Sequence, residues 1–105
     1  MKLLKIEPLI AILISTASQA EYVDQCDTVE KIAYSVMSAR QKGQTPTEFL
    51  KLVNRTNPSI AELDTHLSLM FRAWLVPVED SAKEKLIKVR VFSKNQHDKC
   101  WTGQA

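Results

Sequence analysis

The sequence predicts an all-α protein, a small antiparallel bundle of about four helices closed by one disulfide. Apolar residues recur at steps of three and four through several segments, which is the period of a helix with one buried face. The 105 residues include only 2 glycines and 4 prolines, too few for the many turns of a β-sandwich. The 2 cysteines lie far apart, near the two ends of the predicted domain.

Residues 1–20 have the order of a secretory signal peptide. Lys2 and Lys5 make the beginning basic, an apolar run follows over residues 9–14, and small or polar side chains lead to Ala20. That order is typical of a leader that is cleaved on export. The apolar run is too short to cross a bilayer, which takes about 20 apolar residues.

Cleavage near Ala20 would leave residues 21–105 as a single helical domain, in the periplasm or secreted, with no stable membrane span. No cysteine follows Ala20 directly, which argues against a lipoprotein. Glu7 and Pro8 are unusual in a leader, so the alternative is that the segment is retained as an N-terminal anchor.

The first predicted helix runs from about Thr28 to Lys42. Asp27 and Glu30 are predicted to form a capping box at its start, and Gly43 supplies the residue that ends it. Its apolar face is formed by Val29, Ile32, Ala33, Val36 and Met37.

A second, short helix is predicted over Pro46–Asn54, because Thr45 can cap it and proline is favoured in a first turn.

A third helix is predicted to begin at Pro58 by the same reasoning and to run to about Leu75, before Pro77. Its wide apolar surface predicts the central helix of the bundle, with these side chains in the core: Ile60, Leu63, Leu67, Leu69, Met70, Phe71, Ala73 and Trp74.

The last segment allows two interpretations. Residues 87–91 alternate between apolar and basic side chains, which is the period of a strand. A capping box from Ser81 to Glu84 and an apolar spacing that ends at Cys100 instead fit a helix over about 82–99. We favour the helix, because no other segment alternates well enough to pair with a single strand.

Cys26 and Cys100 are predicted to form one internal disulfide, because an exported protein meets an oxidising compartment. The bridge would enclose about 75 residues, for which the chain-entropy model gives about 4.5 kcal/mol of stabilisation. The alternatives are an intermolecular bridge, or a metal site in which His66 and His97 join the two cysteines.

The sequence contains no recognisable catalytic constellation. It has no glycine-rich phosphate loop, no G-x-S-x-G and no H-E-x-x-H. Asp64 and His66 are two residues apart, and such side chains do not face each other on a helix. We therefore predict no catalytic residue, no metal ligand and no cofactor. A net charge of +2 is too small to indicate nucleic acid as a partner.

Four residues of the last segment are candidates for binding a partner. Lys83, Arg90 and Lys94 fall on one side of a helix, which is either an ordinary solvated face or a contact for an acidic protein or anionic surface. Trp101 either packs over the disulfide or is exposed as a binding anchor, since tryptophan is enriched in binding hot spots.

Residues 26–43 resemble a known group of proteins. The early Cys26, the late Cys100 and the pattern Met-x-x-Arg-Gln-x-Gly at residues 37–43 are similar to small exported bacterial helical proteins that have no assigned activity. The resemblance implies a Gram-negative periplasm, a Cys26–Cys100 bridge and no catalytic residue. A weaker analogy, of architecture alone, is to the periplasmic immunity proteins of contact-dependent toxin systems.

These observations predict an exported, periplasmic small protein-binding module, of the inhibitor or immunity type, with a protein partner in the cell envelope. The alternative is a phage- or envelope-associated accessory factor, such as one that controls lysis, held by its N-terminal segment. A small hydrolase is the least favoured function, and the oligomeric state is left open.

Overall fold

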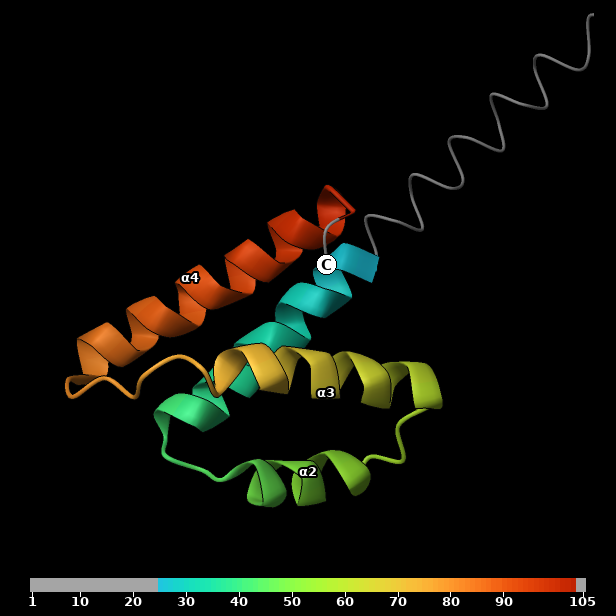
Figure 1. Ribbon diagram of the computed structural model, residues 1–105, viewed down its shortest axis with the longest axis horizontal. Helices are drawn as coiled ribbons and strands as arrows, with labels where there is room; N and C mark the ends of the chain where they lie inside the picture. Colours follow the sequence, from blue (N-terminus) through green and yellow to red (C-terminus); the bar gives the residue numbers. More distant parts are fainter. Residues whose placement is uncertain (1–24, 104–105) are drawn as a thin grey trace, which may run out of the picture.

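The computed structural model describes residues 25–103, so the predicted leader over residues 1–20 lies outside the described residues. Within them the chain forms four helices and no strand (Figure 1). The first covers residues 25–41 (α1), and the others are α2 (Pro46–Asn54), α3 (Ile60–Ala73) and α4 (Ala82–Trp101). The predicted all-α bundle is confirmed. No described helix has both the length and the apolar character that crossing a membrane requires.

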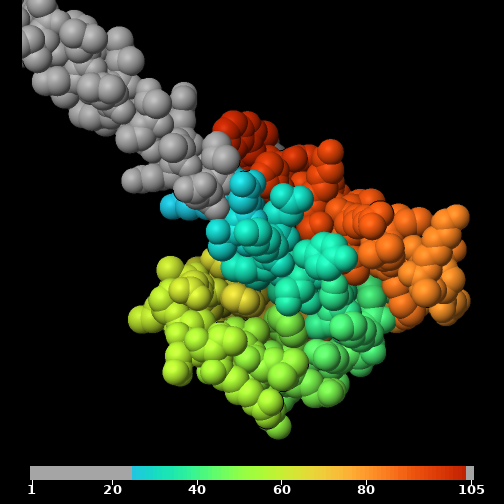
Figure 2. Space-filling model, turned by 180° about the vertical axis from the view of Figure 1, so that it is seen from behind, coloured from blue at the N-terminus to red at the C-terminus, as the bar shows by residue number. Residues whose placement is uncertain are grey.

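α1, rather than α3, is the central helix of the bundle. The α1 side chains of Ala33, Val36 and Met37 are completely buried, and Figure 2 shows α1 between α4 on one side and α2 and α3 on the other. The other three helices each contribute one face to the core, with these buried residues: Phe49, Val53, Leu69, Met70, Ala73, Val89 and Phe92.

The prediction that α3 is central is therefore wrong. Ile60, Leu67 and Phe71 were expected in the core, yet 89%, 43% and 75% of their surface is exposed. The face of α3 that packs on the bundle is centred on Leu69 and Ala73 instead. Trp74 is half-buried and packs against the core at the end of the helix.

Two predicted helix starts need correction. α3 begins at Ile60, with Ser59 as the cap that accepts from the Glu62 backbone N–H at 3.1 Å. Asn57 has a φ of 50°, which is left-handed backbone and not the extended conformation that a capping residue adopts. Asp27 does not cap α1 either, because the helix already includes residue 25.

The remaining boundaries follow the predicted signals closely. Thr45 and Glu48 form the complete capping box of α2. Gly43 has a φ of 81°, and the Gln44 N–H donates to the Ala39 carbonyl at 3.1 Å, which is the six-to-one bond of a Schellman ending. Ser81 caps α4 by accepting from the Glu84 N–H at 3.1 Å.

α4 settles the ambiguity between helix and strand. It is one helix of 20 residues, and its buried side chains are Val89, Phe92, Ser93 and Gln96. Because a helix satisfies its own backbone hydrogen bonds, the segment needs no partner strand. Ile87 and Val91, which created the alternating pattern, are about half exposed on the opposite side.

The predicted disulfide joins Cys26 to Cys100, with their Cα atoms 5.5 Å apart and a sequence separation of 74. Cys26 is completely buried. The bond ties the described beginning of α1 to the last turn of α4, and it excludes the alternatives in which these cysteines bind a metal or bridge two chains.

Candidate functional site

The four residues predicted to bind a partner lie along one line of α4. With about 100° of rotation per residue, Lys83, Arg90, Lys94 and Trp101 fall within about 40° of one another. All four are exposed. The line is about 27 Å long, at about 1.5 Å of rise per residue.

Apolar side chains lie among these cations. Ile87 and Val91 are 48% and 51% exposed, and half of the Trp101 surface is exposed as well. We call this surface the α4 outer face and define it by Lys83, Ile87, Arg90, Val91, Lys94 and Trp101. The α4 outer face therefore combines three cationic side chains with three partly exposed apolar ones.

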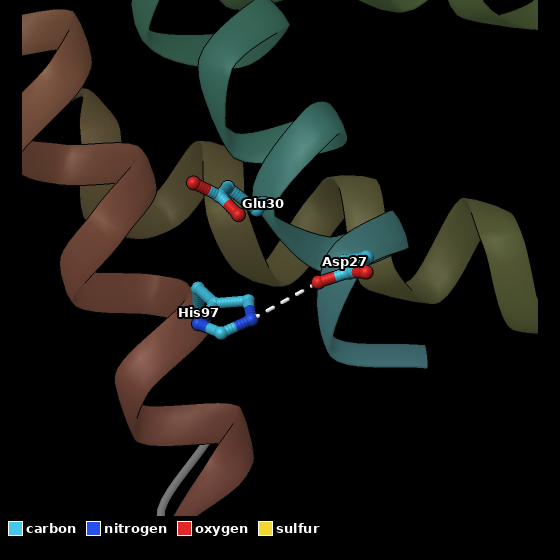
Figure 3. A group of neighbouring side chains, drawn as sticks. All are labelled: Asp27, Glu30 and His97. Carbon is cyan, nitrogen blue, oxygen red and sulfur yellow. Dashed lines mark hydrogen bonds and ion pairs between the residues drawn. The ribbon is translucent and has the colours of Figure 1, made fainter. Parts of the chain in front are cut away.

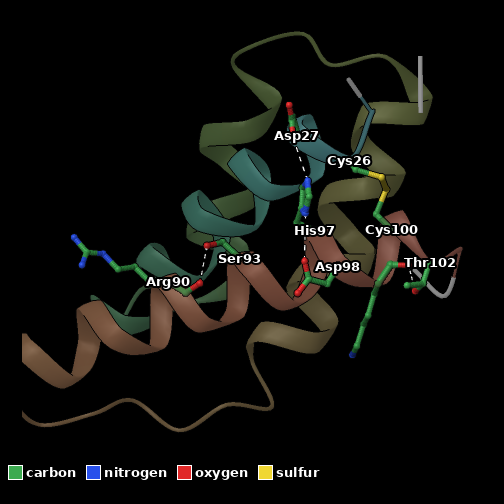
Figure 4. A network of polar contacts seen from close by, with 9 residues as sticks. Cys26, Asp27, Arg90, Ser93, His97, Asp98, Cys100 and Thr102 are labelled. Atoms are coloured by element: carbon green, nitrogen blue, oxygen red, sulfur yellow. Dashed lines mark hydrogen bonds and ion pairs between the residues drawn. A yellow bond between two sulfur atoms is a disulfide. The ribbon is translucent and has the colours of Figure 1, made fainter. Parts of the chain in front are cut away.

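The positive charges of the α4 outer face are not neutralised within the described part of the chain. None of Lys83, Arg90 and Lys94 forms one of the ion pairs among residues 25–103. Figure 4 shows the Arg90 side chain extending away from the bundle. By contrast, Lys88 lies nearer the core and forms an ion pair with Glu79 at 3.6 Å.

A second group of polar side chains lies where α1 meets α4 (Figure 3). His97 Nε2 is 3.1 Å from a carboxylate oxygen of Asp27, and its Nδ1 is 3.4 Å from one of Asp98. The hydrogen bond to Asp98, followed by the bond to Asp27, raises the pKa of His97 above its ordinary value of 6.5. Partial desolvation acts in the opposite direction, and the negative charge of Glu30 adds to the increase.

His97 of α4 and Asp27 of α1 form an ion pair that joins the two helices beside the disulfide (Figure 4). The ligand atoms of Asp27, Glu30 and His97 lie within 4.8 Å of one another, which is the arrangement of a possible cation site. These three residues differ from the metal ligands that the sequence suggested, which were the two cysteines with His66 and His97. His97 and Asp27 already satisfy each other, however, as the bridging pair.

The other histidine lies in a different part of the molecule. His66 Nδ1 is 2.7 Å from the Glu62 carbonyl, and its ring centroid is 6.4 Å from that of Phe49. Phe49 in turn lies 6.1 Å from Trp74, so these rings help α2 pack on α3. Asp64 is exposed and forms no hydrogen bond or ion pair with His66 in the described structure. Asp64 and His66 are therefore not an acid–histidine pair.

Two neighbouring residues, Arg40 and Gln41, hold the connection between α3 and α4. Arg40 Nε donates to the Val76 carbonyl at 2.9 Å. Gln41 Nε2 donates to the Pro77 carbonyl at 2.9 Å, while its Oε1 accepts from the Glu79 N–H at 2.8 Å. Both belong to the Met-x-x-Arg-Gln-x-Gly pattern at residues 37–43.

The position of Gln41 in the sequence indicates that its side chain is buried. It lies four residues after Met37 and eight after Ala33, so it belongs to the buried stripe of α1, and it is only 2% exposed. A polar side chain on such a stripe needs hydrogen-bond partners inside the protein. What the sequence could not supply was the identity of those partners, which lie 36 and 38 residues away.

No protein-family model, no curated protein and no solved structure matches this chain.

Proposed function

We propose that this protein is an exported protein-binding module that docks through its α4 outer face onto an acidic surface of a protein partner in the cell envelope. The observation that carries the proposal is the alignment of Lys83, Arg90 and Lys94 with the half-exposed Trp101 on one face of α4. Complementary charge guides such an encounter and fixes its orientation. A tryptophan at the same face supplies contact area of the kind found in hot spots.

An acidic protein fits this face better than an anionic lipid surface does. A helix that lies in a membrane interface buries a continuous apolar side among the lipid tails. The side of α4 that carries Val89 and Phe92 is buried in the bundle instead. Its outer face offers only the partly exposed Ile87, Val91 and Trp101, set among three cations.

Export is supported by the leader-like segment over residues 1–20 and by the Cys26–Cys100 disulfide, since such bonds persist in oxidising compartments. An inhibitor or immunity-type role is consistent with a rigid small domain that binds by its surface. Intact-mass measurement of the protein from the periplasmic fraction should give a chain that begins at Glu21. A chain that still begins at Met1 would contradict the cleaved module and favour the anchored accessory factor.

Docking is tested by placing a photo-crosslinking amino acid at Ile87, in the α4 outer face, and another at Phe71, on α3. The Ile87 probe should give one discrete adduct with a protein rich in surface Asp and Glu, identified by mass spectrometry. The Phe71 probe should not capture that protein. Absence of any protein adduct at Ile87 would refute the proposal.

Charge reversal tests whether binding depends on the α4 outer face or only on the positive charge of the whole protein. The variant Lys83→Glu/Arg90→Glu/Lys94→Glu should bind the crosslinked partner more weakly by about tenfold or more. The matched variant Lys31→Glu/Lys42→Glu/Lys51→Glu changes the charge equally at three other exposed lysines and should bind almost normally. Equal losses in the two variants, or stronger binding to phosphatidylglycerol vesicles than to any protein, would contradict docking on a protein partner.

A further inference from the structure

Three side chains that can bind a metal meet where α1 packs on α4 (Figure 3). Asp27 and Glu30 are three residues apart on α1, so their carboxylates project from the same side of that helix. His97 comes from α4 and directs its Nε2 at Asp27, at a distance of 3.1 Å. The ligand atoms of all three residues lie within 4.8 Å of one another. The fold therefore brings one imidazole and two carboxylates to the same place.

We propose that Asp27, Glu30 and His97 bind one divalent transition metal ion, with Zn²⁺ as the representative of that class. Imidazole nitrogen and carboxylate oxygen are both ordinary ligands of zinc. The nitrogen makes the set less suited to Mg²⁺ and Ca²⁺, which are bound by oxygen ligands. Three protein ligands leave a fourth coordination position for water or another group, as in open zinc sites rather than closed structural ones.

The distances between the ligand atoms need only a small adjustment. Ligand atoms that are about 2.1 Å from a tetrahedral zinc ion lie roughly 3.4 Å from one another. His97 Nε2 and the Asp27 oxygen are already 3.1 Å apart. The widest separation in the group would shorten by at most about 1.4 Å. Rotation of the Glu30 side chain allows this, because Glu30 forms none of the ion pairs among residues 25–103.

A further carboxylate, outside the three ligands, holds the histidine ring on its other side. Asp98 Oδ1 lies 3.4 Å from His97 Nδ1, and Figure 4 shows the ring between Asp27 and Asp98. A histidine that binds a metal through one nitrogen almost always donates its other N–H to a carboxylate, a carbonyl or water. The contact with Asp98 therefore favours the tautomer in which the Nε2 lone pair is available to a metal.

The proposed site borders an open groove of about 540 Å³. Asp27 and Glu30 line this groove together with Lys31, Tyr34 and Ser93. A metal ion can therefore reach the two carboxylates from solvent, and a water molecule can complete its coordination without movement of a helix.

The metal and the His97–Asp27 ion pair are alternatives at the same nitrogen. The ion pair holds a proton on Nε2, whereas Zn²⁺ takes the Nε2 lone pair and that proton passes to solvent. Either arrangement joins α1 to α4. None of the three ligands belongs to the α4 outer face, so this inference does not depend on the proposed function.

Isothermal titration calorimetry with Zn²⁺ tests the site, on the disulfide-bonded protein without a histidine tag. The wild type should bind one ion per chain with a micromolar dissociation constant, and excess Mg²⁺ should not displace it. Glu30→Gln should weaken binding by at least about tenfold, because it removes one of three ligands and leaves the His97–Asp27 contact intact. Glu84→Gln, which removes the same charge at an exposed position of α4, should bind like the wild type.

The two histidines provide a second matched pair. His97→Gln should also weaken binding by at least about tenfold, whereas His66→Gln should not. Zn²⁺ should raise the melting temperature of the wild type but not that of Glu30→Gln, since a ligand that binds only the folded state stabilises it. Circular dichroism checks that each variant folds, and Glu30→Gln decides the test if His97→Gln does not.

Two results would overturn the proposal. One is that the wild type shows no saturable binding at submillimolar Zn²⁺. The other is that Glu30→Gln binds Zn²⁺ as tightly as Glu84→Gln, which would mean that the ion is held by surface charge alone. Displacement of Zn²⁺ by an equal concentration of Mg²⁺ would likewise contradict a site for a transition metal.

Discussion

Gln41 is a single polar residue that fixes a whole connection. Its amide satisfies the Pro77 carbonyl and the Glu79 N–H while the side chain is almost completely buried. Gln41→Ala leaves both backbone groups without a partner, so we expect the free energy of unfolding to fall by about 2–3 kcal/mol. Urea denaturation measures this loss. Lys42→Ala, at the exposed neighbouring position, should cost far less, and an equal loss in the two variants would contradict the role of Gln41.

The His97 side chain makes the stability of the protein depend on pH. Its pKa is raised in the folded state by Asp98 and then Asp27, so the folded protein holds the proton more tightly than the unfolded chain. The stabilisation is fully present below the unfolded pKa, about 6.5, and is lost as pH rises through the folded pKa.

An NMR titration of the His97 ring should therefore give a midpoint above 6.5. Asp27→Asn/Asp98→Asn should return it towards the ordinary value, because both hydrogen-bonded carboxylates are removed. Urea denaturation on either side of the midpoint should show less stability at the higher pH, and His97→Asn should lack that contribution. A midpoint below 6.5 would contradict the ion pair.

Among the helices, α4 carries the proposed docking face and depends on its first turn. Ser81 accepts from the Glu84 N–H, and loss of a serine cap typically costs about 1 kcal/mol. We expect Ser81→Ala to lower the free energy of unfolding by that amount in urea. Ser35→Ala, at an exposed position inside α1, should be neutral or slightly stabilising, because alanine is the better helix former. No difference between the two variants would show that the cap is unimportant.

The helices also show where sequence patterns were reliable. α2 has the predicted bounds Pro46–Asn54, because a complete capping box and a first-turn proline act locally. The start of α3 was predicted two residues too early, because Asn57 and Ser59 are both possible caps and only the left-handed conformation of Asn57 decides between them. The strand-like alternation in α4 was misleading because Ile87 and Val91 remain on the surface.

For the whole molecule, the Cys26–Cys100 bond is the main covalent restraint. It closes nearly the entire described chain, so its reduction should lower the free energy of unfolding by about 4.5 kcal/mol in the chain-entropy model. Urea denaturation with and without a thiol reductant measures the change. Cys26→Ala/Cys100→Ala should unfold at a lower urea concentration and be insensitive to the reductant. Equal stability of the oxidised and reduced wild type would contradict this restraint.

The sequence by itself determined the helical class, most helix boundaries, the disulfide and the side of α4 on which Lys83, Arg90 and Lys94 lie. Periodicity, caps and cysteine count are properties of neighbouring residues or of the chain as a whole, and they can be recognised without coordinates. The tertiary structure decided that α1 is central, that Phe71 is exposed, and that His97 meets Asp27. Those outcomes depend on which apolar faces pack together, and several faces of this chain are apolar enough to compete for the same core.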